Sequence, residues 1–373
     1  MAVTWDNTAE NVANRVVYAE RRNAPGTRHT AGFNKILAVL VAFWTMLGML
    51  GLTACVNPAP EKKTPTPAAQ PEEPATWPLT GLPREDSTPH PVVAVKVENT
   101  VAARPQSGLE DADIVFEEQV EGGMTRYNAV FHAHTPEEIG PVRSVRPMDP
   151  GIAAPFGGML VYSGGVPAFE SQVSASGLRG FNEDQARGAL YRVKFRAMPH
   201  NLYLSIPKLY EKVGKEHTME PDAPQIFDFA NPDQGEQPTA VSSGNPANTL
   251  VAHFPSLVAS YNWTGSRWQR VDGGTAASAR SGAPLQTDNV VVVLTSIIDT
   301  GAKDAAGATV PETVLTGSGT AYVASGGSVA KVTWSKDSEG SPLQLTDSAG
   351  EPVLLNRGTT WIELLPNPNF SFQ

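Results

Sequence analysis

The chain has 373 residues, a length that suggests two domains rather than one. Apolar residues make up 40% and charged residues 18%, so a core can form and disorder of the whole chain is excluded. The net charge of −10 argues against nucleic-acid binding through bulk charge. A single cysteine excludes intramolecular disulfides and cysteine-rich metal sites.

An uncharged apolar run at 36–52 precedes this cysteine. It is short for a membrane span and long for the apolar part of a signal peptide. Its end, Leu52-Thr53-Ala54-Cys55, resembles the lipobox of bacterial lipoproteins, where the chain is cut before the cysteine and the thiol is acylated. We predict a signal peptide at 1–54 and a lipid such as palmitate on Cys55, on the extracytoplasmic face of the cell membrane. A transmembrane anchor with a chance cysteine is the alternative.

The lipidated cysteine is followed by a tether at 55–77, where repeated prolines favour an extended chain without a core. The next segment, 78–226, has the pattern of a mixed α/β domain with a central sheet. Its predicted elements are a strand at 92–97, a β-hairpin at 113–132 around Gly122-Gly123, helix starts at Pro150 and Pro167, a strand at 159–162 and a helix capped by Ser205.

The residue composition and the pattern of apolar runs change in the second half of the chain. The stretch 227–248 is rich in Pro, Gly, Asn and Gln and is predicted to be a linker. Beyond it, at 249–366, short apolar runs alternate with Gly-containing turns, which indicates a smaller, mostly β domain followed by a tail at 367–373. The predicted fold class is therefore α+β.

Polar side chains are predicted to gather on one face of the hairpin. With a two-residue turn, Gln119 faces Arg126 and Glu117 faces Asn128. Arg126 is then a diagonal neighbour of Glu117, close enough for a cross-strand ion pair. A slip of one residue in the register would exchange the two faces.

Further arginines flank the hairpin, and a His-Asn pair follows later. Arg grips carboxylate or phosphate in a planar, bidentate way, and His titrates near neutral pH. We predict a polar cleft that binds an anionic or sugar-like ligand. Its candidate residues are Arg104, Glu117, Glu121, Arg126, Arg143, Arg146, His200 and Asn201. The alternative is that nearby carboxylates neutralise these arginines in internal salt bridges and that His200 is structural.

The same region resembles the YerB-like lipoproteins, a two-domain family of unknown function. The motifs that carry the resemblance include Arg104-Pro-Gln-Ser-Gly-Leu109, Val120-Glu-Gly-Gly123, Ile139-Gly-Pro-Val-Arg-Ser144, Gly164-Gly165, His200-Asn201-Leu202-Tyr203, Asn289-Val-Val-Val-Val293 and Asn356-Arg-Gly-Thr-Thr-Trp-Ile362. The resemblance spans nearly all of 78–366. It implies an envelope lipoprotein with two domains and supplies no reaction.

Other motifs give weaker signals. His132 and His134 lie on one strand face, but no third metal ligand is apparent nearby. Ser163 follows a strand and precedes a helix, yet Val161 stands where a nucleophile elbow has its first Gly. Walker and dinucleotide-binding motifs are absent from the sequence, so we expect neither a cofactor nor a metal.

Three functional hypotheses follow. The first is a membrane-anchored, non-catalytic binding or accessory factor for an anionic envelope polymer or a wall-synthesis protein. The second is an envelope hydrolase or transferase acting on a phosphorylated or glycan substrate, with Glu117 or Glu121 as base and His200 as acid. The third is a solute-binding lipoprotein, which ranks last because its usual two similar lobes do not fit a β-rich second half.

Overall fold

The computed structural model describes residues 75–85, 90–214, 223–366 and 368–373. These residues belong to one compact unit, Pro71–Gln373. The predicted signal peptide, the lipidation site Cys55 and almost all of the tether lie outside the described residues. Within the described part of the chain, no helix is both long and apolar enough to span a bilayer.

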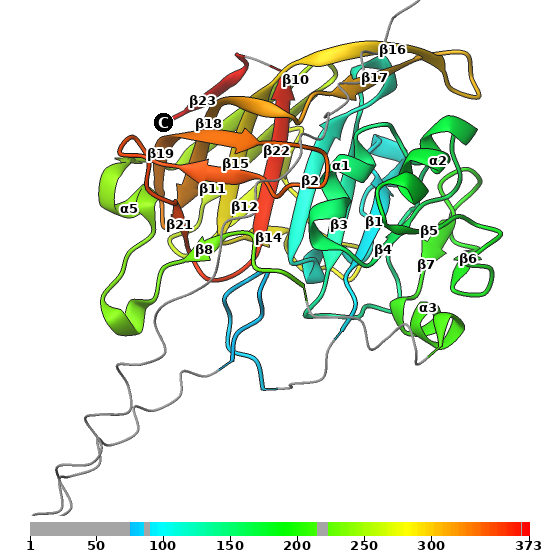
Figure 1. Cartoon of the computed structure of the whole chain (residues 1–373), viewed down its shortest axis with the longest axis horizontal. Helices are drawn as coiled ribbons and strands as arrows, with labels where there is room; N and C mark the ends of the chain where they lie inside the picture. The colour runs from blue at the N-terminus through cyan, green and yellow to red at the C-terminus, as the bar shows by residue number, and fades with distance from the viewer. Residues whose placement is uncertain (1–74, 86–89, 215–222, 367) are drawn as a thin grey trace, which may run out of the picture. The chain divides into compact units, whose positions relative to one another are not determined.

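The N-terminal half mixes short helices with strands (Figure 1). Its elements are β1 (Val93–Glu98), β2 (Ile114–Gln119), β3 (Thr125–Phe131), α1 (Asp149–Ala153), β4 (Met159–Val161), α2 (Pro167–Ala175), β5 (Arg179–Phe181), β6 (Leu190–Arg192), β7 (Leu202–Leu204) and α3 (Ile206–Val213).

The rest of the chain is mostly β, as predicted. Its elements are β8 (Asp228–Phe229), α5 (Thr239–Ser243), β9 (Asn245–Pro246), β10 (Thr249–Phe254), β11 (Leu257–Trp263), β12 (Trp268–Asp272), β13 (Thr275–Ala276), β14 (Gln286–Thr287), β15 (Asn289–Thr295), β16 (Ile297–Lys303), β17 (Thr309–Thr313), β18 (Gly317–Ser325), β19 (Ser328–Lys336), β20 (Gln344–Thr346), β21 (Leu354–Leu355), β22 (Thr360–Pro366) and β23 (Phe370–Phe372). The segment 227–248, expected as a linker, thus carries β8, α5 and β9.

Strands from both halves join one 11-stranded sheet, with the order β20-β19-β18-β15-β22-β2-β3-β1-β4-β5 and β9 beside β19. The junction is β22, which pairs in parallel with both β15 and β2. Almost every residue of β22 is buried, as expected for a parallel strand covered on both faces. The two predicted segments therefore share a sheet.

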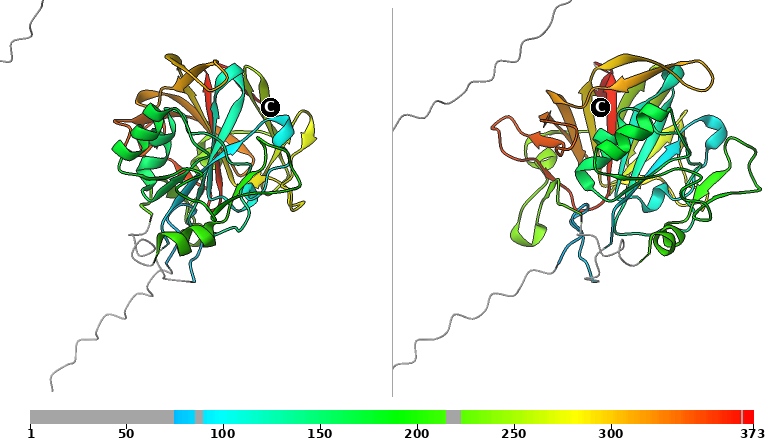
Figure 2. Two further views of the ribbon diagram at one scale, coloured as in Figure 1. Left: turned by 90° about the vertical axis from the view of Figure 1, so that its right-hand side faces the viewer. Right: turned by 45° about the vertical axis from the view of Figure 1, so that its right-hand side comes forward.

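Different layers cover the two faces of this sheet (Figures 1 and 2). One face packs against α1, α2 and α5 through a core that includes Phe116, Ile152, Phe169 and Ile362. The other face packs against a second sheet, of order β13-β12-β11-β10-β23 with β14 beside β12. The α+β fold class predicted from sequence is confirmed.

Local sequence signals correctly predicted several strands and helix starts in the N-terminal half. The predicted strands appear as β1 and β4, and the hairpin as β2–β3. Pro167 opens α2, because its fixed φ and missing N–H suit the first turn of a helix. Ser205 caps α3, as predicted, and its hydroxyl accepts the N–H of Lys208 at 3.4 Å.

The predicted hairpin register is wrong by one residue. Glu117 lies opposite Tyr127, not Asn128, and Glu118 lies opposite Arg126. The turn is a 3₁₀ turn over Glu121–Gly123, closed by the N–H of Val120 donating to the carbonyl of Met124, and not a two-residue turn. Since directly opposite residues share a face, Glu117 and Arg126 lie on opposite faces of the sheet and the predicted pair between them does not form.

Candidate functional site

Glu121, Arg126 and Arg146 come together on the helix-covered side of the hairpin. Arg146 binds Glu121 in a bidentate way, with Nε–Oε1 at 2.5 Å and Nη2–Oε2 at 2.8 Å. Arg126 lies 3.8 Å from the same carboxylate and donates to the carbonyl of Ser144 at 3.0 Å. Burial, reinforced by the positive charge of Arg146, lowers the pKa of Arg126 to about 10. Both guanidinium groups are therefore occupied by protein groups and hold the backbone at 144–146.

A second buried ionic group continues along the same face. Lys96 contacts the carboxylates of Glu118 and Asp149, the latter at 2.8 Å. Asn128 also donates to Asp149, at 3.0 Å, and the backbone N–H of Arg146 donates to its other oxygen at 2.6 Å. Burial lowers the pKa of Lys96 to about 8. This network ties the start of α1 to the sheet.

Arg143 and His200 meet at a buried carboxylate that the sequence did not single out. Both oxygens of Glu98 lie within 3.0 Å of His200 Nδ1, and Oε2 lies 3.7 Å from Arg143 Nε. The carboxylate is buried, whereas about a quarter of the Arg143 side chain and of the His200 side chain is exposed. An imidazole and a guanidinium are therefore partly exposed at the surface, and the buried carboxylate of Glu98 orients both of them.

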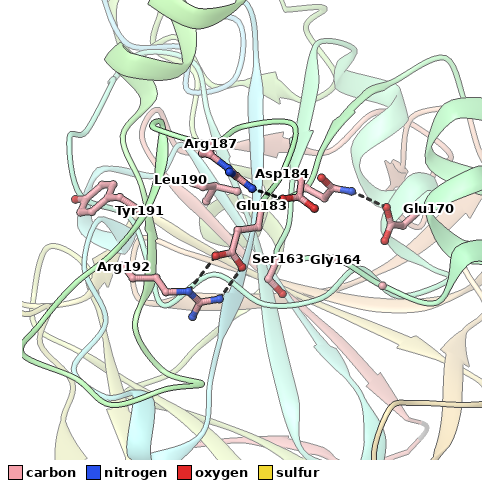
Figure 3. Close-up of a pocket in the computed structure, with 11 residues that line it drawn as sticks. Ser163, Gly164, Glu170, Glu183, Asp184, Arg187, Leu190, Tyr191 and Arg192 are labelled. Atoms are coloured by element: carbon pink, nitrogen blue, oxygen red, sulfur yellow. Dashed lines mark hydrogen bonds and ion pairs between the residues drawn. The ribbon is translucent and has the colours of Figure 1, made fainter.

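A separate set of residues lines a polar pocket of about 530 Å³ (Figure 3). It is lined where β4 and β5 end, by Ser163-Gly164-Gly165 and Asn182-Glu183-Asp184, together with Glu170 of α2 and residues next to or within β6. β1, β4 and β5 run parallel, so their carboxyl ends meet at one edge, which is where open α/β sheets bind ligands.

The pocket walls carry paired charges of both signs. Glu183 and Arg192 form a bidentate pair at 2.9 and 2.6 Å, and Asn182 donates to Glu170 at 3.0 Å. The predicted residue Asn201 lies at the edge of this wall, where its oxygen accepts from Arg192 Nη1 at 2.8 Å. Carboxylates, amide, hydroxyl and guanidinium groups thus surround the space.

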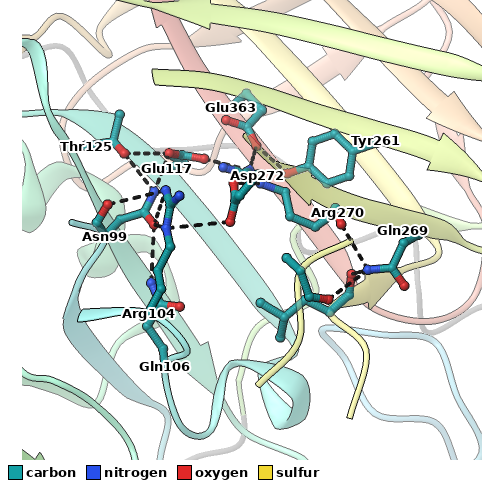
Figure 4. A network of polar contacts seen from close by, with 12 residues as sticks. Asn99, Arg104, Gln106, Glu117, Thr125, Tyr261, Gln269, Arg270, Asp272 and Glu363 are labelled. Carbon is teal, nitrogen blue, oxygen red and sulfur yellow. Dashed lines mark hydrogen bonds and ion pairs between the residues drawn. The ribbon is translucent and has the colours of Figure 1, made fainter. Parts of the chain in front are cut away.

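Arg104 and Glu117 lie on the other face of the sheet, in a buried network at the second sheet (Figure 4). Glu117 accepts from Asn99 at 2.8 Å and contacts Arg270 Nη1 at 2.7 Å. Arg104 donates to the side-chain oxygen of Asn99 at 2.9 and 3.0 Å. Arg270 also binds Glu363 at 3.0 Å. The eight predicted residues are therefore divided between two faces.

Glu363, Tyr261 and Arg270 are polar core residues that sequence reasoning missed. Burial and the neighbouring charge of Glu117 raise the pKa of Glu363 well above its ordinary value. Tyr261 donates to Glu363, and Arg270 Nη1 lies 2.9 Å from the Tyr261 hydroxyl. A lone Glu in the strand pattern of 360–364 was the one available signal, because it interrupts an otherwise apolar run.

Catalytic and metal-binding arrangements are limited in the described part of the chain. Ser163 Oγ lies 3.3 Å from Ser144 Oγ, and no imidazole or carboxylate among the described residues bonds to it. His132 is buried and stacks edge-on against Trp77. In the same residues, no group of three or more His, Cys, Asp or Glu side chains is arranged to hold a metal ion.

Comparison with known proteins places these features in a family. Residues 79–219 match the N-terminal domain, and residues 252–362 the C-terminal domain, of a family described as a protein of unknown function, DUF3048. A protein of Bacillus subtilis (strain 168), described as "Putative lipoprotein YerB", is 32% identical over 300 residues, covering 78% of this chain and 86% of the relative. The chain belongs to the DUF3048 family.

A solved structure supports the family assignment. The crystal structure of YerB protein from Bacillus subtilis aligns with a TM-score of 0.67 at 26% identity. The aligned region covers 80% of this chain and 99% of the solved chain. The resemblance inferred from sequence motifs is confirmed, and the DUF3048 description assigns no activity.

Proposed function

We propose that this DUF3048 protein is a lipid-anchored, extracytoplasmic factor whose body binds a glycan of the cell envelope. The observation that carries the proposal is the 530 Å³ pocket at the carboxyl ends of β4 and β5. Its size falls in the range of small-molecule sites. The paired arginines 126 and 146 support the site by fixing the backbone next to Ser163, instead of contacting the ligand themselves.

The mixed lining of the pocket favours a polyol over a multiply charged anion. Glu170, Glu183 and Asp184 would repel phosphate groups, while Arg187 and Arg192 are already paired with carboxylates. Planar carboxylate, amide and guanidinium groups can each hydrogen bond to neighbouring hydroxyls of a sugar. A site built to hydrogen bond hydroxyl groups discriminates strongly against ligands that lack them.

A thermal-shift experiment tests the pocket. The Pro71–Gln373 unit is mixed with a tetrasaccharide of the wall glycan and, separately, with a phosphorylated polyol. A ligand at 100 times its Kd stabilises by about 2.7 kcal/mol, which corresponds to several degrees of Tm. We expect the glycan shift in the wild type and in a control, Lys331→Gln on the distant strand β19, but not in Arg192→Gln.

Two results would contradict this proposal. One is the absence of a shift with the glycan in the wild type. The other is an equal shift in Arg192→Gln and in the control variant, which would place binding elsewhere.

The proposed membrane localisation rests on the lipobox and on the relative described as a lipoprotein. Two acyl chains suffice for stable anchoring, since each buried methylene contributes about 0.8 kcal/mol. Cells that express the chain and are fed a radiolabelled fatty acid should label the wild type but not Cys55→Ala. Label on Cys55→Ala, or none on either protein, would refute the anchor without affecting the pocket.

A second function, catalysis in the envelope, is favoured by the Glu98–His200 contact. A carboxylate that holds imidazole Nδ1 leaves Nε2 available as a base, and Arg143 lies beside it to stabilise negative charge. Incubation with wall glycan and polyol phosphate, followed by mass spectrometry, should then show a new product in the wild type and none with His200→Gln. An identical product pattern for both proteins would exclude this role.

A further inference from the structure

The two most exposed large apolar side chains of the described residues lie on two loops that contact each other. Val101 is 83% exposed and Met198 69%, the highest values among the large apolar side chains of the described residues, and Phe195 is 46% exposed. With Lys194 and Arg196, these three residues define what we call the cationic–apolar patch. Scattered apolar residues on a surface need no explanation, but a cluster of the most exposed ones with cations indicates a contact site.

Two loops that are distant in sequence form the patch. Arg196, in the loop between β6 and β7, donates to the carbonyl of Ala102 at 2.7 Å and to that of Pro105 at 2.5 Å. These carbonyls belong to the loop between β1 and β2, which also carries Val101. The guanidinium thus fastens the loops together, and Val101 and Met198 project from neighbouring segments.

The charge of the patch is opposite to that of the whole molecule. The loop 193–200 contains Lys194, Arg196 and His200 and no acidic residue, whereas the chain has a net charge of −10. Among the described residues, Lys194 and Arg196 form no ion pair with a carboxylate. The His200 ring instead contacts the buried carboxylate of Glu98 through Nδ1. Two cations without a carboxylate partner among the described residues therefore lie next to exposed apolar side chains.

We infer that the cationic–apolar patch docks on the anionic surface of the membrane to which the chain is tethered. This inference rests on the proposed lipid anchor for its location. Apolar side chains gain free energy by entering the headgroup boundary, and cations beside them are attracted by anionic lipids. An acidic body would otherwise be repelled from the leaflet, so the patch selects one orientation. Arg192, at the end of β6, lines the pocket, which then lies near the headgroups.

Vesicle sedimentation tests the docking surface. The Pro71–Gln373 fragment is suitable because it is a compact unit, and the crystallised relative aligns over 80% of the chain. It is mixed with vesicles of phosphatidylcholine alone or with an equal amount of phosphatidylglycerol. We expect binding only to the anionic vesicles, about fivefold weaker for Lys194→Gln and about tenfold weaker for the double variant Val101→Ser/Met198→Ser.

Matched variants keep the test specific. Lys331→Gln removes an exposed cation from β19, and Val258→Ser removes an apolar side chain that is 42% exposed in β11. Both should bind like the wild type. Absence of binding to anionic vesicles, or equal loss in the control variants, would overturn the inference, and a protein partner would then be the remaining occupant. The fragment lacks Cys55, so this outcome is independent of the acylation result.

Discussion

Arg270 contacts two buried acidic side chains that are far apart in the sequence, Glu117 and Glu363. Its Nη1 lies 2.7 Å from Glu117 and 3.0 Å from Glu363, and all three side chains are almost fully buried. Such a group does not raise stability over a well-packed apolar core, but loss of one partner leaves an uncompensated buried charge. The residue therefore acts as a constraint on how β2, β12 and β22 meet.

We expect Arg270→Ala to lower the free energy of unfolding by about 3–5 kcal/mol. Urea unfolding followed by circular dichroism measures the change. The control is Arg187→Ala, whose side chain is 81% exposed in its pair with Asp184, and which should unfold like the wild type. A loss below 1 kcal/mol for Arg270→Ala would show that this guanidinium does not compensate a buried negative charge.

Asp113 makes a separate, pH-dependent contribution. Burial raises its pKa from 3.8 to about 6, although Oδ2 accepts backbone N–H groups of His132 and Ala133 at 2.5 and 2.9 Å. Between those two pH values the folded state binds more protons than the unfolded state. Stability from this group is therefore full below about pH 4 and falls as the pH rises to 6, by at most about 1.4 kcal/mol per pH unit.

In Asp113→Asn this slope should disappear, because the amide oxygen can accept the same two N–H groups without titrating. Unfolding midpoints in urea at pH 4, 5 and 6 give the comparison. Asp111→Asn, two residues earlier and partly exposed, should retain the wild-type slope. If Asp113→Asn keeps it as well, another group is responsible.

At the scale of elements, the hairpin turn shows what sequence can and cannot predict. The strands β2 and β3 follow from apolar runs and a Gly-Gly signal, but the register depends on whether the turn takes two residues or a 3₁₀ turn. The 3₁₀ turn also makes contacts that are distant in sequence, since Ser256 of the β10–β11 turn donates to the carbonyls of Gly122 and Gly123. A one-residue error then moved Glu117 to the wrong face.

The two glycines of this turn should respond differently to alanine. Both have positive φ, 65° for Gly122 and 70° for Gly123. A Cβ on Gly122 would meet only Met124, at 4.0 Å, whereas one on Gly123 would lie 2.7 Å from Pro255. We expect Gly122→Ala to cost about 1 kcal/mol for the left-handed backbone and Gly123→Ala about 3 kcal/mol in urea unfolding. Equal costs would mean that the turn is not held against the second sheet.

The residues of the candidate site also fall into two groups, those that local sequence indicates and those that only tertiary contacts reveal. Arg143, His200 and Asn201 could be selected from sequence because they stand in Pro- and Gly-containing loops. Glu98 could not be selected from sequence because it ends an apolar strand. Its contact with His200 forms only when the 193–201 loop packs against the end of β1. Arg270 and Glu363 could not be selected for a similar reason, since nothing local indicates that β12 and β22 approach β2.

At the scale of the whole molecule, the question is whether the two family domains are independent. β22 comes from the C-terminal domain, yet it pairs with β2 on one side and β15 on the other. Its side chains Ile362 and Leu364 lie in the same core as Phe116 of β2 and Val291 of β15. A strand buried in this way couples the two halves, because neither can lose it without exposing its own core.

We therefore expect Ile362→Ala to destabilise both halves together, by about 2–5 kcal/mol. Native-state hydrogen exchange provides the measurement, with amides of β1 reporting on one half and amides of β19 on the other. The control is Ile298→Ala in β16, whose side chain is 48% exposed and whose loss should change little. If the β19 amides lost protection while those of β1 kept it, the halves would unfold separately and the shared sheet would be only a contact. Equal loss would establish one cooperative unit, in which the pocket at β4–β5 depends on residues near the C-terminus.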